Sequence, residues 1–181
     1  MASEIIVNTI KAPTTGANAN KVIIPTGVKL VAPESVIQRV QVANSAYSSN
    51  STPGNWANTN YTISITPEYS NSLIKLSFAI PFRLNGTSTY LRGGFRCNRT
   101  INGTNTNTII NTTSNAEQHQ VRNATNEYDD VYSGFHVDTP ATTGVVAYTF
   151  QSYIHTDSGA NYIATFDANI GGYLMLEEIA Q

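Results

Sequence analysis

The sequence has a single cysteine, Cys97, and few charged residues, which make up 12% of its 181 positions. One cysteine cannot form a disulfide within the chain, so a disulfide-stapled domain is excluded. Ten Lys and Arg residues and twelve Asp and Glu residues give a formal charge of −2, and the cations are scattered singly. Because a nucleic-acid binder concentrates positive charge in one patch, we expect no nucleic-acid partner.

Long apolar runs are also missing. A helix that spans a bilayer needs about 20 consecutive, mostly apolar residues, and the sequence contains no such run. Residues 1–7 lack the basic region and the long apolar region of a secretion signal. We therefore expect a chain that is made in a cytoplasm and is not inserted in a membrane.

Strong helix formers are scarce, and the apolar 40% of the chain is rich in β-branched residues and in tyrosine, of which there are ten. Such residues favour strands. Asn, Thr and Ser together supply 58 of the 181 residues. The sequence predicts an all-β protein whose surface is kept soluble by neutral hydrogen-bonding groups rather than by charge.

Alternating apolar and polar residues indicate the clearest strands. Residues 61–65 and 74–80 both alternate with a period of two, which is typical of a strand with one buried face. The turn-forming residues 67–71 between them predict a hairpin. Residues 145–154 carry bulk on both faces, which favours a sandwich interior or a subunit interface. Further strands are expected over 161–166 and 173–179.

The first 35 residues differ from the rest of the chain. Short β-like runs such as Val22–Ile24 and Val28–Val31 alternate with proline and glycine. Each run is too short to bury a face alone, so this segment stays disordered, packs on a neighbour or intertwines with further copies of itself. We predict an N-terminal segment over 1–35 and a folded domain over 36–181.

Two polar stretches, 47–60 and 98–126, are expected to lie mostly in exterior loops or edge strands, because they contain too few apolar residues to form cores of their own. The pairs Asn85-Gly86 and Asn102-Gly103 suit type I′ hairpin turns. Residues 114–121 could form one or two helical turns.

The acidic residues Glu127, Asp129 and Asp130, with Asp138 nearby, are the one concentration of carboxylates that could supply a glycosidase pair. That chemistry needs two carboxyl groups held about 5 to 10 Å apart, one with a raised pKa. Nothing in the spacing enforces such a geometry, and a solvated loop explains the cluster as well. We therefore expect no enzyme activity.

The histidines His119, His136 and His155 are far apart and match no metal-binding spacing. We expect no metal and no cofactor, although three copies of one histidine could meet on a threefold axis. Cys97 lies between two nearby arginines, which could activate a thiol. A small, half-buried strand residue is the interpretation that we favour for it.

Aromatic residues in or beside the polar stretches are the best candidates for recognition. Aromatic rings that stack on sugars, beside amide and hydroxyl groups, can hold a neutral glycan. The alternative is that these rings fill loop bases or an interface. The receptor-binding candidates are Tyr47, Trp56, Tyr90, Tyr128 and Tyr132.

Several motifs resemble those of short fibre proteins of tailed bacteriophages, especially phages of aquatic bacteria. Residues 4–11, 22–30 and 36–42 are similar to the start of these proteins. Residues 61–76, YTISITPEYSNSLIKL, are similar to their central hairpin, and residues 172–180, GYLMLEEIA, to their terminal strand. One position departs from the pattern: Glu34 stands where the family usually has glycine.

The resemblance implies a homotrimeric tail-fibre protein of the virion. Its N-terminal segment would attach to another virion protein or form a shaft, and residues 36–181 would form a jelly-roll-like β-sandwich knob. Loops of the knob would bind a host surface glycan or an outer-membrane component.

Three alternatives stay open. The chain could be a capsid decoration or head fibre protein of the same kind of particle. A small polysaccharide depolymerase that uses the acidic cluster is a second alternative, although tail depolymerases are generally much longer β-helical chains. A cellular lectin is the third.

Overall fold

The computed structural model describes residues 32–43, 47–87, 90–110, 119–122, 127–156, 160–165 and 172–181. Every regular element in these ranges is a β-strand, which confirms the predicted all-β class. No helix in them is long and apolar enough to cross a membrane. The strands are β1 (Val36–Ala43), β2 (Ser48–Asn50), β3 (Trp56–Ile65), β4 (Leu73–Gly86), β5 (Tyr90–Ile101), β6 (Thr104–Ile110), β7 (His119–Arg122), β8 (Glu127–Asp138), β9 (Val146–Ile154), β10 (Ala160–Thr165) and β11 (Tyr173–Ile179).

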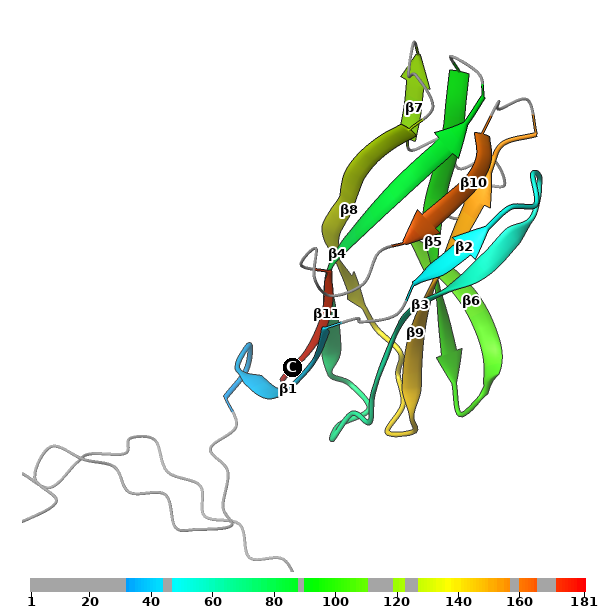
Figure 1. Cartoon of the computed structure of the whole chain (residues 1–181). Helices are drawn as coiled ribbons and strands as arrows, with labels where there is room; N and C mark the ends of the chain where they lie inside the picture. The colour runs from blue at the N-terminus through cyan, green and yellow to red at the C-terminus, as the bar shows by residue number, and fades with distance from the viewer. Residues whose placement is uncertain are drawn as a thin grey trace, which may run out of the picture. The chain divides into compact units, whose positions relative to one another are not determined.

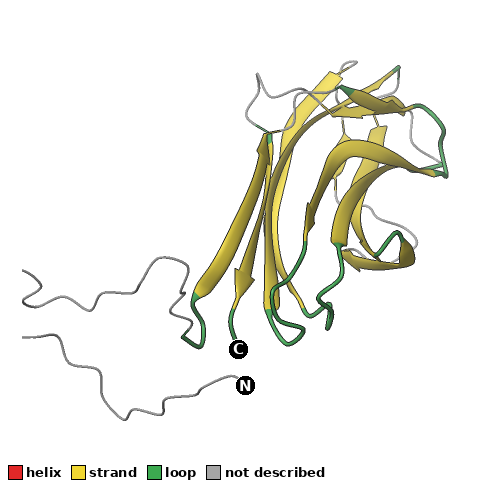
Figure 2. Cartoon of the chain, turned by 90° about the horizontal axis from the view of Figure 1, so that it is seen from below, coloured by secondary structure: helices red, strands yellow, loops and turns green. Residues whose placement is uncertain are grey.

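The strands form two antiparallel sheets (Figures 1 and 2). In sheet A, β4 pairs with β8 along one edge and with β11 and β10 along the other, and β1 and β2 extend the sheet beyond these two. In sheet B the order is β3-β9-β5-β6, and β7 also pairs with β5. The orders β8-β4-β11-β1 and β6-β5-β9-β3 have the connectivity of an eight-stranded jelly roll. The predicted jelly-roll-like sandwich is therefore confirmed.

The core lies between the two sheets. Alternate residues of β3, β4, β5 and β9 point inward and are buried, as the period-2 pattern requires. Aromatic rings pack across the two layers. The ring centroids of Phe78 on β4 and Phe150 on β9 are 4.9 Å apart, and those of Phe82 on β4 and Phe95 on β5 are 5.2 Å apart. Each fully buried side chain of this size contributes about 1.5–3 kcal/mol.

The predicted hairpin of residues 61–80 is wrong. Both stripes are strands, but β3 pairs with β9 in sheet B, whereas β4 lies in sheet A. The segment between them, 66–72, crosses from one sheet to the other. Periodicity reports that two strands each bury one face, and it does not distinguish a shared sheet from two sheets that face the same core.

Residues 98–126 were expected to lie mostly in exterior loops or edge strands, and among the described strands β6 is such an edge strand, whereas residues 98–101 belong to the interior strand β5. Residues 98–101 complete β5 and residues 104–110 form β6. Asn102 and Gly103 have φ angles of 50° and 73°, so the predicted type I′ turn is confirmed. Asn85 and Gly86 instead continue β4.

The remaining expectations for this region have mixed outcomes. Residues 114–118 of the predicted helical turns lie outside the described residues, and His119–Arg122 is a strand. Residues 146–154 form the central strand β9, with its inner face in the core, which confirms a sandwich interior. The strands expected near 161–166 and over 173–179 are confirmed as β10 and β11.

Backbone hydrogen bonds join the first residues of the folded domain to its last residues. The Glu34 N–H donates to the carbonyl of Ala180 (2.8 Å), and the Ala180 N–H donates to that of Ser35 (2.9 Å). Glu34 itself has a φ of 65°, the left-handed region that favours glycine. Residues 1–31 of the predicted N-terminal segment lie outside the described residues, so the boundary at residue 35 stays a prediction.

Candidate binding face

A ladder of neutral polar side chains crosses the outer face of sheet B. Gln151 of β9 lies at its centre: its Oε1 accepts hydrogen bonds from Asn98 Nδ2 (3.0 Å) and from Arg96 Nε (2.6 Å). Its Nε2 donates to Asn58 Oδ1 on β3 (2.6 Å). On the other side, Thr108 Oγ1 of β6 donates to Asn98 Oδ1 (2.8 Å). We call Asn58, Gln151, Asn98 and Thr108 the amide ladder; it spans β3, β9, β5 and β6, four of the five strands of sheet B.

An aromatic pair adjoins the amide ladder. Trp56 of β3 lies opposite Tyr153 of β9 in the strand register, and their ring centroids are 4.9 Å apart. The guanidinium carbon of Arg96 lies 4.3 Å from the centroid of the Trp56 ring, a cation–π distance. Burial lowers the pKa of Arg96. Because Arg96 also bonds Gln151, it holds the indole and the amide ladder in one fixed arrangement.

The predicted receptor-binding residues are not gathered in one place. Trp56 is half-buried on the outer face of sheet B, and Tyr47 is 60% exposed just before β2. Tyr47 is held at its carbonyl, which accepts from Asn60 Nδ2 at 2.7 Å. Tyr90 begins β5, and its side chain lies outside what the structure describes.

Tyr128 and Tyr132 lie in strand β8, so their placement in a loop is wrong. Tyr132 packs in the core, with its ring 5.3 Å from Phe95 and 5.1 Å from Phe78. The Tyr128 hydroxyl donates to Asp130 Oδ2 at 2.7 Å, and this hydrogen bond raises the pKa of Tyr128. Both tyrosines occupy inward positions of the edge strand β8 and pack against the core. Large aromatic side chains with one polar end commonly take such half-buried positions.

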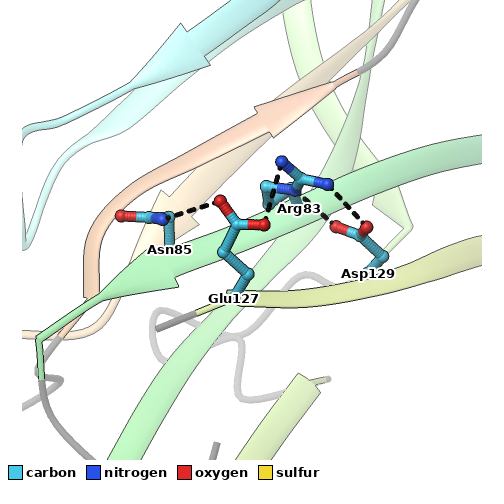
Figure 3. A network of polar contacts seen from close by, with 4 residues as sticks. All are labelled: Arg83, Asn85, Glu127 and Asp129. Atoms are coloured by element: carbon cyan, nitrogen blue, oxygen red, sulfur yellow. Dashed lines mark hydrogen bonds and ion pairs between the residues drawn. The ribbon is translucent and has the colours of Figure 1, made fainter. Parts of the chain in front are cut away.

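The acidic cluster forms an ion-pair network on the outer face of sheet A (Figure 3). Arg83 of β4 bonds both carboxylate oxygens of Asp129, at 2.6 and 2.8 Å, and lies 3.1 Å from Glu127. The hydrogen bond from Arg83 lowers the pKa of Asp129. A general acid needs the opposite shift, so this geometry does not favour glycosidase chemistry.

Asp138, the fourth carboxylate considered, is buried in an interlayer cluster. Its Oδ1 accepts from Arg99 Nη1 at 2.6 Å and its Oδ2 from the Tyr148 hydroxyl at 2.9 Å. Cys97 nearby is fully buried, and burial raises the pKa of its thiol. This opposes an activated thiolate. Among the described residues, no group of three His, Cys, Asp or Glu side chains gathers where a metal could bind.

Sequence reasoning missed Arg96, Gln151 and Tyr153 as parts of the face. Each points outward from a strand whose other face is in the core, and outward positions can be read from alternation. Their meeting depends on which residues lie opposite each other, such as Trp56 with Tyr153. Register between strands distant in sequence has no local signal.

No family model and no curated protein matches the chain. Among solved structures it is similar to chains of infectious bursal disease virus. The Gt strain structure is 12% identical with a TM-score of 0.44, over 89% of this chain and 43% of that one. The VP2 subviral particle structure is 11% identical with a TM-score of 0.40, over 87% of this chain and 41% of that one. This chain thus spans less than half of the viral chains, and likenesses of this size carry no functional argument.

Proposed function

We propose that the chain is a structural protein of a virion, of the tail-fibre type, that binds the host surface. The amide ladder beside Trp56 and Arg96 is the observation that carries this proposal. It offers amide and hydroxyl groups on a rigid sheet next to an indole, the chemistry that recognises a neutral glycan. The motifs at residues 4–11, 61–76 and 172–180 that resemble phage fibre proteins support the same assignment.

Two physical features support binding rather than catalysis. Sites that bind by a preformed surface benefit from side chains locked by neighbours, and Gln151 is held by three partners. The carboxylates suited to acid catalysis are occupied instead, Asp129 by Arg83 and Asp138 by Arg99. The fold itself carries no functional inference, since jelly rolls serve many purposes.

The chain is proposed to act as a homotrimer with its N-terminal segment docked on another virion protein. Weak binding at each of three knobs would then be reinforced by avidity. Light scattering should give a mass of three chains or a multiple of three, and a strictly monomeric full-length chain would contradict this part of the proposal.

A competition experiment tests host binding. Host cells incubated with the purified chain should adsorb fewer particles. Trp56→Ala should weaken this competition by about tenfold, the equivalent of 1.4 kcal/mol. Tyr69→Ala is the matched control, because Tyr69 is an exposed aromatic residue in the segment after the opposite end of β3. Equal competition by both variants would exclude the Trp56 face as the binding site.

A further inference from the structure

Among the strands that the structure describes, β8 lies at an edge of sheet A. It pairs with β4 along its whole length, from Glu127 opposite Asn85 to Asp138 opposite Ile74. Of the described strands, β4 is the one that pairs with it, and Figure 1 shows β8 beside β4 at the margin of its sheet. An edge of this length is a template for pairing with another chain.

The odd-numbered residues of β8 direct their backbone groups away from β4. The Val131 N–H donates to Oδ1 of the neighbouring Asp130 side chain at 2.7 Å. The residue opposite Val131 on β4 is Pro81, which has no N–H to offer. In an antiparallel ladder, alternate residues bond to opposite neighbours. Ser133, Phe135 and Val137 therefore present backbone groups at the outer edge as well.

The same residues expose apolar side chains on the outer face of sheet A. Val131, Phe135 and Val137 are 46, 72 and 45% exposed. The exposed acidic residues of β8 lie in its first four positions, Asp138 at its other end is buried, and Val131–Val137 contains no acidic residue. The protective charges usual on an edge strand are thus confined to one end, and the other end is apolar.

We propose that β8 pairs antiparallel with β8 of a second copy, about a twofold axis at Ser133. Ser133 lies near the middle of the strand, so this register pairs residues 128–138 with the same residues of the other copy. Val131 then lies opposite Phe135, an aromatic and β-branched pair that stabilises sheets. The Val131 N–H gains a carbonyl in place of its bond to Asp130.

In this register the side chains of one β8 strand complement those of the other copy in charge and in shape. Asp130 lies opposite His136, and Tyr132 lies opposite Gly134, which has no side chain to obstruct the ring. Asp129 faces Val137, whose own neighbour across the ladder is Lys75. An axis at Asp129 would instead place two carboxylates opposite each other, and an axis at Val131 would place Glu127 against Phe135.

This contact goes beyond the proposed function and is separate from threefold association. A charge at the axis tests it, because Ser133→Asp sets two like charges directly opposite each other only in this pairing. The mass of the full-length assembly should fall by a factor of two, whatever the number of copies in its other contacts. Ser64→Asp on β3, at a comparably exposed strand position, should leave the mass unchanged.

A disulfide at the same position provides the second test. Residues opposite each other in a hydrogen-bonded pair have Cα atoms about 5.5 Å apart, which a disulfide can bridge. Oxidised Ser133→Cys should form covalent dimers, and Ser64→Cys should not; the native Cys97 is buried and does not compete. Equal cross-linking of both variants, or an unchanged mass of Ser133→Asp, would overturn the proposal.

Discussion

Asp138, the last residue of β8 in sheet A, accepts a hydrogen bond of 2.6 Å from Arg99 of β5 in sheet B. The pair closes one side of the sandwich, and its side chains are 7 and 15% exposed. The Tyr148 hydroxyl completes the cluster from β9; burial, with the charge of Asp138, raises the pKa of Tyr148. The carboxylate first considered as catalytic thus joins the two layers.

Asp138→Asn should lower the free energy of unfolding by about 3 kcal/mol, because it leaves the Arg99 charge buried without its counter-ion. Arg99 Nε already has no hydrogen-bond partner among the described residues. Asp129→Asn is the control: it breaks an exposed pair with Arg83, which is worth less than about 1 kcal/mol. Urea unfolding of both variants measures the difference, and equal losses would refute the structural role of Asp138.

Acid should destabilise the domain through Glu177 and Glu178. The hydrogen bond from Arg39 lowers the pKa of Glu177 against the opposing effect of burial. Burial raises the pKa of Glu178, but hydrogen bonds from Gln38 and from the Glu68 N–H outweigh it, so the net shift is downward.

Acid lowers the stability because the pKa values of both glutamates are lower in the folded chain than in the unfolded chain. The unfolded chain binds protons at a pH where the folded chain does not, so stability is full above a glutamate pKa of about 4.3 and is lost as the pH falls through the folded values. Urea unfolding from neutral pH to about pH 3 should show this decline. Glu178→Gln should be less stable at neutral pH and show a shallower decline, and an unchanged slope would count against Glu178.

Gly172→Ala should destabilise the domain by about 1–3 kcal/mol, the usual cost of overpacking. A Cβ at this position would overlap the hydroxyl of Tyr61, which is fully buried, and would lie 2.9 Å from Pro81 Cδ. Tyr61→Phe removes the overlapping oxygen, so the double variant should lose less than the sum of the single changes. Additive losses in thermal unfolding would show that Tyr61 is not the obstacle.

Glu34→Gly should raise the free energy of unfolding by about 0.5–1 kcal/mol. The left-handed conformation costs a residue with a Cβ about 1–2 kcal/mol, and glycine avoids this cost. Part of the gain is offset because glycine loses more backbone entropy on folding. Glu34→Ala keeps the Cβ and should bring no gain. A stabilised Glu34→Ala would point to the charge of Glu34 instead.

The strands were predictable where one face is buried. The alternation of Tyr61, Ile63 and Ile65 is enough to identify β3, and the paired positive φ angles at Asn102 and Gly103 follow from the residue types. The strand β8 was not predictable in the same way. Its exposed row mixes Asp129 with Val131 and Phe135, and its inward row includes Gly134, so no clean alternation results.

The binding face was predictable in composition but not in place. The Asn- and Thr-rich segment 98–126 was expected to lie mostly in exterior loops or edge strands, because it has too few apolar residues to form a core of its own. In the structure Asn98 and Thr108 lie opposite each other on β5 and β6 and bond across the sheet. Gln151 is 53 residues from Asn98 in the sequence, and the pairing register of β5 with β9 brings the two side chains together.

Electron microscopy of purified particles, with an antibody against the folded domain 36–181, tests the proposed function most directly. The account predicts several copies of the domain at the end of a tail fibre. Label on the capsid would favour a decoration or head-fibre protein instead. Particles that are complete and carry no copy of the chain would contradict a structural role in the virion.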